Sequence, residues 1–421
     1  MPRWQTQARL FGARPVRILT PKSAAEVSAA VGEATERELA VRMVGGGTAA
    51  GPVAVCNGIM LRPTALTQLT WIDPEVIRVG AGVTVSTLVA ELRRRGRAIA
   101  GIAGPADATV AGSVSTAGYG PHEPLAASVQ SLEMVAADGR VRLVVADEPW
   151  GRAAVGGLGG FGIITAVEVR TSAAYNDIVT TDVLAFEEAL AGWREWADDA
   201  AWMQWLWVPG AERVLVRRGT REPAVAAGAD AVRASMLPAA HEARWRRRAG
   251  LAVPLLLPRL NRNAVVGAAA QSPTSVAWSA GVHRDTAREL ATTWTVPIDQ
   301  ALPALRMLRE ALRTTAQSTT TALSVRTIDA DTGLLSPFYQ RRSALISARV
   351  RLPAPFERYF TAVAAALAPF DARPHWGSYV PEAENSPMAG HPGGAAAREV
   401  RDQIDPLGLF DSAAVARLLR T

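Results

Sequence analysis

The sequence predicts an α+β protein built from two domains. Its 421 residues are too many for one compact hydrophobic core, so two cores are expected. Over residues 1–172, short apolar runs alternate with helical stretches and glycine-rich turns, a pattern typical of mixed helices and sheets. From residue 173 tryptophan becomes dense and glycine becomes rarer. We therefore expect a second domain over 173–375 and a C-terminal segment over 376–421.

The first domain has clear signals for individual helices and strands. Asp138–Gly139, inside an apolar stretch, is a strong signal for a hairpin turn. The stretch 86–96 opens with a Ser–Thr helix-capping pair and ends at Gly96, a residue that commonly ends a helix. The predicted elements are a helix over 26–38, a strand entering the glycines at 45–47, a strand over 76–85, a helix over 86–96, a hairpin over 132–144 and a strand over 160–171.

The second domain is predicted to be a mixed or antiparallel sheet covered by helices. Residues 292–315 have the pattern of a strand followed, after Pro297, by a helix, and 321–329 and 343–352 have the pattern of paired strands. The tryptophans within 202–207 are expected to pack in a core or at a domain interface, with an aromatic wall of a substrate site as the alternative.

Composition and charge argue against nucleic-acid and membrane partners. The net charge of +6 comes from arginines spread over the whole chain, with Lys22 the only lysine, and no nucleic-acid-binding motif accompanies them. The longest apolar run, 251–258, is much shorter than the roughly 20 residues of a membrane span. It follows a basic run at 244–250, which we interpret as a helix end before a buried strand or turn, with a membrane-surface or nucleic-acid contact as the alternative. A small-molecule substrate is therefore expected.

Cysteine and histidine usage indicates a cytoplasmic protein without a metal site. Cys56 is the only cysteine, so no intramolecular disulfide can form, which fits a reducing compartment. The N-terminus lacks the apolar region of a secretory signal. The five histidines are scattered without metal-ligand spacing. The sequence leaves the oligomeric state open.

Three glycine-rich loops lie in the first domain, at 41–52, 101–120 and 155–165. Glycine allows the backbone to approach a ligand closely and to direct its N–H groups at an anion. Each loop alone is equally well explained as a plain turn or a packing loop. Together they indicate a long cofactor that carries phosphates and passes several backbone segments.

These loops and their flanking strands resemble the FAD-binding domain of the vanillyl-alcohol-oxidase (p-cresol methylhydroxylase) flavoprotein superfamily. The resemblance is carried by "VIRVGAGVTVSTLVAELRRRG" (76–96), "ATVAGSVSTAGYG" (108–120), "VQSLEMVAADG" (129–139) and "GGFGIITAVEVRT" (159–171). The segments "TWTVP" (293–297), "SVRTIDADTGLLSP" (324–337), "RPHWG" (373–377) and "DPLGLF" (405–410) narrow it to the alditol oxidase and aldonolactone oxidase branch. The resemblance implies a two-subdomain FAD-binding domain, a substrate domain that caps it, and a C-terminal segment that returns to the FAD domain.

The resemblance implies an FAD site at residue level. The first loop would hold the pyrophosphate by its backbone, the second loop would make a second contact, and "RPHWG" would end beside the flavin ring. The implied cofactor-binding residues are Gly45, Gly46, Gly47, Thr48, Ala49, Thr109, Gly112, Ser113, Thr116, Ile164 and His375. Relatives often have His-Ser where this chain has Thr48-Ala49, and that histidine commonly bonds to the flavin. Because threonine cannot form this bond, non-covalent FAD is expected.

The substrate side departs further from the family pattern. The "E-x-R" of polyol oxidases is Ser324-Val325-Arg326 here, and Ser378 stands where they place a lysine after "HWG". On the neighbouring strand, Ser347 and Arg349 align with a histidine and a threonine that contact substrate hydroxyls. The candidate catalytic residues are Ser324, Arg326, Arg349, His375 and Ser378. Two arginines without a matching acid favour an anionic or carbonyl-rich substrate over a neutral polyol.

Alternatives stay open for the central residues. Arg326 would face the reacting carbon and stabilise negative charge during hydride transfer, or instead pair with Asp329, Asp331 or Glu382. His375 is either a base that takes a hydroxyl proton or a hydrogen-bonding wall beside the flavin.

The predicted function is that of an FAD-dependent oxidoreductase, an oxidase or dehydrogenase that removes hydride from a carbon bearing hydroxyl. Oxygen or another acceptor would reoxidise the flavin. The altered site favours a specialised, non-polyol substrate, and the Arg-, Ala- and Gly-rich composition favours a role in natural-product biosynthesis. The alternative is a non-redox cyclase or isomerase that keeps the flavin fold.

Overall fold

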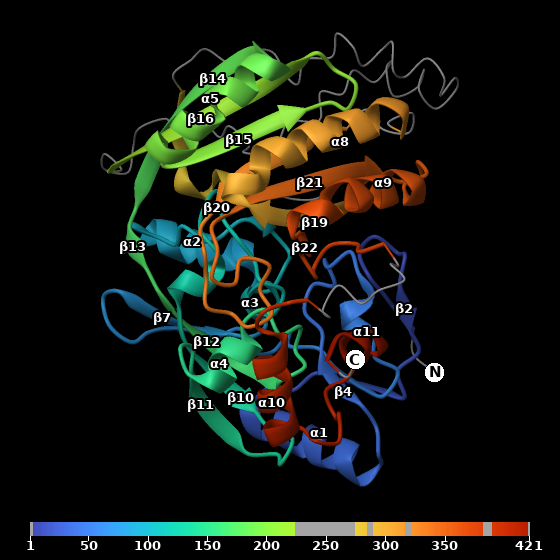
Figure 1. Cartoon of the computed structure of the whole chain (residues 1–421). Helices are drawn as coiled ribbons and strands as arrows, with labels where there is room; N and C mark the ends of the chain where they lie inside the picture. Colours follow the sequence, from blue (N-terminus) through green and yellow to red (C-terminus); the bar gives the residue numbers. More distant parts are fainter. Residues whose placement is uncertain (1–2, 224–273, 284–288, 316–320, 382–389, 420–421) are drawn as a thin grey trace.

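The computed structural model describes residues 3–223, 274–283, 289–315, 321–381 and 390–419. The predictions for the basic run at 244–250 and the apolar run at 251–258 lie outside these residues. Figure 1 shows the first 170 residues and the C-terminal helices in the lower part of the molecule, and a large sheet from the middle of the chain in the upper part.

The lower part contains two sheets with helices packed around them. One is parallel, with strand order β3-β5-β4, and the other is antiparallel, with strand order β11-β10-β12-β7-β6. Their strands are β3 (Arg17–Leu19), β4 (Val41–Met43), β5 (Ile59–Leu61), β6 (Leu69–Trp71), β7 (Val76–Gly80), β10 (Val129–Val135), β11 (Val141–Val145) and β12 (Ile163–Arg170). The helices are α1 (Ala24–Glu36), α2 (Val85–Arg94), α3 (Val110–Ser115) and α4 (Pro149–Ala154). Short strands complete it: β1 (Trp4–Gln5), β2 (Gly12–Ala13), β8 (Arg97–Ala98), β9 (Gly104–Pro105) and β13 (Ser172–Ala173).

Local signals explain where these elements begin and end. The Asp138–Gly139 turn joins β10 to β11 as predicted, with Gly139 at a φ of +76° that glycine adopts without strain. Helix α2 begins at Val85, one residue before the predicted start, and ends at Arg94, before the predicted end at Gly96. Its cap is Thr84, whose hydroxyl accepts a hydrogen bond from the Thr87 N–H, so the predicted strand over 76–85 ends at Gly80.

The upper part is an eight-stranded sheet with the strand order β17-β14-β16-β15-β20-β21-β19-β22, antiparallel at every pairing. Its strands are β14 (Tyr175–Ala185), β15 (Trp202–Trp207), β16 (Arg213–Pro223), β17 (Thr274–Ala277), β19 (Glu289–Pro297), β20 (Leu323–Ile328), β21 (Ser343–Arg351) and β22 (Arg373–Pro374). The helices α5 (Phe186–Asp199), α8 (Ala301–Thr315) and α9 (Glu357–Leu367) share a core with the sheet. This confirms the predicted helix-covered antiparallel sheet.

Strand alternation gives this sheet one apolar face and one polar face. Trp205, Val325 and Ile346 point into the core that the three helices share. Trp193 and Trp205 meet edge to face, with their ring centres 5.0 Å apart. The tryptophans of β15 therefore form core packing, as predicted, and none of them lines the cavity described below. The opposite face carries the polar side chains of the cavity, together with apolar side chains such as Trp202 and Leu345 that lie outside that core.

The C-terminal segment packs on the lower part. Helices α10 (Gly394–Ile404) and α11 (Ala413–Leu419) follow the upper sheet in sequence but lie in the lower half of the molecule (Figure 1). The Val41 N–H donates to the Leu409 carbonyl, which joins this segment to β4. The limits of the domains at residues 172 and 375 stay predictions. Within the described residues, every helix is too short or too polar to cross a lipid bilayer.

Candidate active site

A cavity of about 330 Å³ lies between the glycine-rich loops of the lower part and the polar face of the upper sheet. All of the predicted site residues line it, although they come from six separate segments of the chain. They are Gly45, Gly46, Gly47, Thr48, Ala49, Thr109, Gly112, Ser113, Thr116, Ile164, Ser324, Arg326, Arg349, His375 and Ser378. The cavity therefore has two halves, one of small residues and exposed backbone and one of polar side chains.

Close contact between the first and second glycine loops shapes the first half. A Cβ on Gly45 would lie 2.3 Å from the Thr109 hydroxyl oxygen, and one on Gly46 would lie 2.3 Å from the Asp107 carbonyl oxygen. Gly47 has a φ of +66°, in the left-handed region that favours glycine. Three glycines in a row are thus required for this approach, not merely tolerated.

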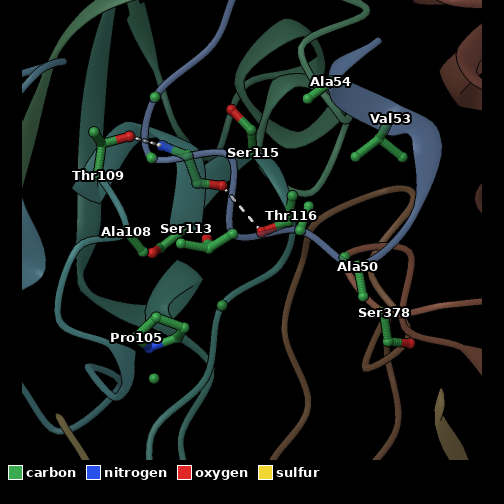
Figure 2. Close-up of a pocket in the computed structure, with 18 of the residues that line it drawn as sticks. Ala50, Val53, Ala54, Pro105, Ala108, Thr109, Ser113, Ser115, Thr116 and Ser378 are labelled. Carbon is green, nitrogen blue, oxygen red and sulfur yellow. Dashed lines mark hydrogen bonds between the residues drawn. The ribbon is translucent and has the colours of Figure 1, made fainter. Parts of the chain in front are cut away.

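Hydroxyl groups order the second loop. The Thr109 hydroxyl accepts from the Gly112 N–H at 3.1 Å, and the Thr116 hydroxyl donates to the Gly112 carbonyl at 3.0 Å (Figure 2). The third loop packs behind it, since the Gly156 N–H donates to the Val114 carbonyl and the Leu158 N–H to the Ser115 carbonyl. Figure 2 shows that this half is walled mainly by small side chains, so a long group that carries phosphates can lie along the backbone.

Arg42 also lines the cavity and is not among the predicted site residues. It is buried in β4 and donates to the carbonyl oxygens of Leu158 and Phe410. It therefore joins the third glycine loop and the C-terminal segment to the first loop. The available signal was a lone arginine inside the apolar strand that precedes the three glycines.

The second half of the cavity is the polar face of the upper sheet. Ser324 and Arg326 of β20 line it while Val325 between them points into the helix-side core. Ser324 is opposite Ser347 of β21, and the Ser347 hydroxyl is 3.0 Å from the Thr293 hydroxyl of β19. A row of polar side chains thus crosses three neighbouring strands.

Arg326 is the main charged group of this row. Its side chain is 9% exposed, and no hydrogen bond or ion pair joins it to any residue that the structure describes. Burial lowers the pKa of its guanidinium to about 10. Tyr119 acts in the opposite direction, and the positive charges of Arg349 and Arg217 act in the same direction as burial. The two acids considered as partners are engaged elsewhere: Asp329 pairs with Arg342, and Asp331 accepts from the Ser336 hydroxyl. Glu382, the third, lies outside the described residues.

The prediction that both Arg326 and Arg349 lack a matching acid is wrong for Arg349, which pairs with Glu289. Arg349 lies 3.7 Å from one carboxylate oxygen of Glu289, and the other carboxylate oxygen lies 3.4 Å from Arg351. Glu289 lines the cavity and was missed because the predicted strand began at 292, whereas β19 begins at Glu289. Only one of the two predicted arginines therefore lacks an acid among the described residues.

His375 is buried against the second loop. Its Nε2 lies 3.1 Å from the Ala117 carbonyl oxygen, so Nε2 carries the proton, and its ring meets Tyr119 edge to face at 5.3 Å. Burial lowers the pKa of His375 to about 4. The imidazole is therefore neutral near pH 7 and a weak base, which favours the interpretation as a hydrogen-bonding wall.

Ser378 lines the cavity, but its hydroxyl is engaged with the backbone. It donates to the His375 carbonyl at 2.6 Å and accepts from the Thr293 N–H at 3.1 Å. These two bonds tie the turn after His375 to β19. The geometry thus gives Ser378 a positioning role for His375, and its catalytic role stays a prediction.

Acid destabilisation is expected from the buried imidazole. The pKa of His375 lies below the value of about 6.5 of an unfolded histidine, so the unfolded chain binds the proton first as the pH falls. The stability from neutral His375 is complete above pH 6.5 and is lost towards pH 4, by about 3 kcal/mol. We expect the drop in thermal midpoint between pH 7 and pH 4.5 to be smaller in His375→Gln than in the unaltered protein. Equal drops in the two proteins would contradict this.

Comparison with protein families agrees with this geometry. A family model described as FAD binding domain matches residues 15–144, and one described as D-arabinono-1,4-lactone oxidase matches residues 167–418. The chain is 24% identical over 419 residues to L-gulono-1,4-lactone dehydrogenase of Mycobacterium tuberculosis, covering 94% of each chain. It is 27% identical over 379 residues to alditol oxidase of a Streptomyces species, covering 86% of each.

Solved structures show the same fold. A solvent-stable cholesterol oxidase superposes with a TM-score of 0.80 at 16% identity, covering 100% of this chain and 97% of that one. Chitooligosaccharide oxidase superposes with a TM-score of 0.66 at 13% identity, covering 95% and 92%. The resemblance to the vanillyl-alcohol-oxidase superfamily and to its alditol and aldonolactone oxidase branch is confirmed, and the non-redox alternative has no support. Because the second family model spans more than half of the sequence, the chain belongs to the D-arabinono-1,4-lactone oxidase family of FAD-dependent oxidoreductases.

Proposed function

We propose that this protein binds FAD without a covalent link and oxidises a small, non-polyol substrate at a carbon that bears a hydroxyl group. The observation that carries the proposal is the position of Arg326, a buried guanidinium without a protein partner in the described residues, in the same cavity as the three glycine loops. Such a cavity has a backbone-lined half for the cofactor and a cationic half for the reacting group.

The residues present fit FAD. Because Gly45, Gly46 and Gly47 have no side chains, their backbone amides line the cavity. The second and third loops add small side chains. A diphosphate flanked by flat rings requires both features. Bound FAD would supply the two-electron oxidant, accepting hydride from the substrate carbon while the hydroxyl proton leaves to a base or to solvent.

The side chains near the cofactor half support a non-covalent complex. Thr48 stands at the loop position where relatives carry the linking histidine. Two histidines line the cavity, and a ring nitrogen of each is close to a backbone carbonyl oxygen. That oxygen belongs to Ala117 for His375 and to Gly281 for His283. Cys56 is buried, and its thiol lies near the carbonyl oxygens of Ala40 and Ile59.

Within this site we assign different tasks to the chain's own residues. Arg326 stabilises negative charge that develops on the substrate oxygen, while neutral His375 forms a wall and holds the second loop through Ala117. Ser378 holds the turn of His375 in place. The Glu289–Arg349 pair borders the substrate half. A cytoplasmic location and a role in natural-product biosynthesis remain part of the proposal.

The state of the flavin tests this proposal. Purified protein is expected to be yellow, and acid precipitation should release all of its flavin into the supernatant because no covalent link is present. Mixing the holoenzyme with hydroxyl-bearing candidate substrates without oxygen should bleach the flavin absorbance band. Flavin that stays with the precipitated protein would overturn the non-covalent assignment. Product formation without bleaching would overturn the oxidoreductase assignment.

A further inference from the structure

The guanidinium of Arg326 is buried, and no described acidic residue forms an ion pair with it. An ionised side chain that is nine-tenths buried is strongly unfavourable unless a counter-ion or several acceptors surround it. No hydrogen-bond acceptor joins Arg326 among the described residues. Burial lowers the pKa of its guanidinium, Tyr119 raises it, and the positive charges of Arg349 and Arg217 lower it further. The cavity around Arg326 therefore has an excess of positive charge.

Ser324 lies beside Arg326 on the same face of β20 and adds a second donor. The Gln204 side-chain N–H donates to the Ser324 hydroxyl oxygen at 3.2 Å, which occupies that oxygen as an acceptor. The O–H of Ser324 has no acceptor among the residues that the structure describes. Gln204 is also the cross-strand partner of Arg326, so the same side chain fixes this corner of the cavity.

Several neighbouring polar groups already have partners, whereas the side-chain oxygen of Gln204 is buried without one among the described residues. The hydroxyls of Ser347 and Thr293 bond to each other, and Arg349 pairs with Glu289. This leaves one buried guanidinium and one hydroxyl, both donors, without an acceptor in the described part of the chain. Two adjacent donors with one net positive charge are complementary to a planar group with two acceptor oxygens and one negative charge.

We propose that the substrate of this enzyme carries a carboxylate, which binds to the Arg326 guanidinium and the Ser324 hydroxyl. The inference rests on the proposed function, because it places this carboxylate in the substrate half of the same cavity. The carboxylate takes the place that a glutamate at position 324 would occupy, so the substrate itself supplies the acid that the chain lacks. A phosphate ester, with nearly two negative charges, would leave one charge unmatched and is the less favoured anion.

The experiment titrates the FAD-loaded protein with matched acids and alcohols. Lactate is compared with propane-1,2-diol, and mandelate with 1-phenylethane-1,2-diol, by the change in the visible flavin spectrum and by the rise in thermal midpoint. We expect each acid to bind at least tenfold more tightly than its alcohol. Arg326→Ala should remove this preference.

Substitutions at Ser324 separate charge from shape. Ser324→Glu places a carboxylate beside Arg326 and should reduce the binding of the acids at least tenfold, whereas Ser324→Gln, of nearly the same size, should reduce it less. Flavin content and the thermal midpoint check that each variant is folded. Equal reductions in the two variants would overturn the proposal.

The outcomes distinguish this inference from the proposed function. Acids and alcohols that bind equally, or glycerol phosphate that binds more tightly than either acid, would overturn the carboxylate site and leave the oxidoreductase assignment intact. Acids that bind preferentially but never bleach the flavin, while product forms, would support the carboxylate site and overturn the proposed reaction.

Discussion

Replacing Arg326 by alanine is expected to slow flavin reduction by roughly 10²- to 10³-fold, the usual effect of removing one charge-stabilising donor from an active site. The guanidinium is buried in the substrate half of the cavity and no described residue neutralises it, so its interactions are available to the substrate. The measurement is the anaerobic rate of flavin bleaching with any substrate that reduces the unaltered protein. FAD content should not change, because Arg326 lies on the upper sheet and not in the glycine loops.

Two matched variants make this result specific. Arg326→Lys keeps the charge but loses the planar fork, so we expect an intermediate rate. Arg218→Ala removes another arginine of the same sheet, one that pairs with Asp182 at 2.6 Å and does not line the cavity. Its rate should stay close to that of the unaltered protein. An Arg326→Ala protein that reduces its flavin at the normal rate would remove this residue from the site.

Gly46→Ala is expected to weaken FAD binding by roughly 10- to 100-fold, which corresponds to about 1–3 kcal/mol of overpacking. The added Cβ would lie 2.3 Å from the Asp107 carbonyl oxygen, a backbone atom that cannot rotate away. The first and second loops must therefore move apart, and the cofactor half of the cavity loses its shape. The measurement is the dissociation constant of FAD from reconstituted apoprotein.

Gly32→Ala is the matched control for this substitution. Gly32 lies inside α1, and a Cβ there would meet no atom within 4 Å. Because alanine is the better helix former, we expect normal FAD affinity and a gain in stability of about 0.5–1 kcal/mol. If both variants bind FAD like the unaltered protein, the close approach of the two loops is not needed for the cofactor.

Local sequence signals located most of the elements that carry the site. The Asp138–Gly139 hairpin, helix α8 after Pro297, and the paired strands β20 and β21 all follow from turn residues and apolar spacing, which act over a few neighbouring residues. The boundaries were less well predicted. β19 begins at Glu289, before its most apolar stretch, so the acid that pairs with Arg349 was not seen.

The state of each side chain could not be predicted in the same way. A histidine next to tryptophan and glycine is compatible with a base or with a wall. Burial lowers the pKa of His375 to about 4, although its hydrogen bond with the Ala117 carbonyl acts in the opposite direction. Ser378 was expected to act on the substrate, yet its hydroxyl bonds to the His375 carbonyl and the Thr293 N–H. Ser378 and Thr293 are 85 residues apart in the sequence, so no local pattern indicates that they are bonded.

By itself, the sequence determined the α+β class, the cofactor family and the identity of the residues at the altered positions, because motif spacing and residue type are properties of the chain alone. Only the tertiary structure decided which of these residues have partners. The antiparallel register places Ser324 and Arg326 on the cavity face and Glu289 beside Arg349, leaving one arginine paired and the other without a described partner. Charge compensation depends on distances of a few ångströms between strands far apart in sequence, and those distances exist only in the folded sheet.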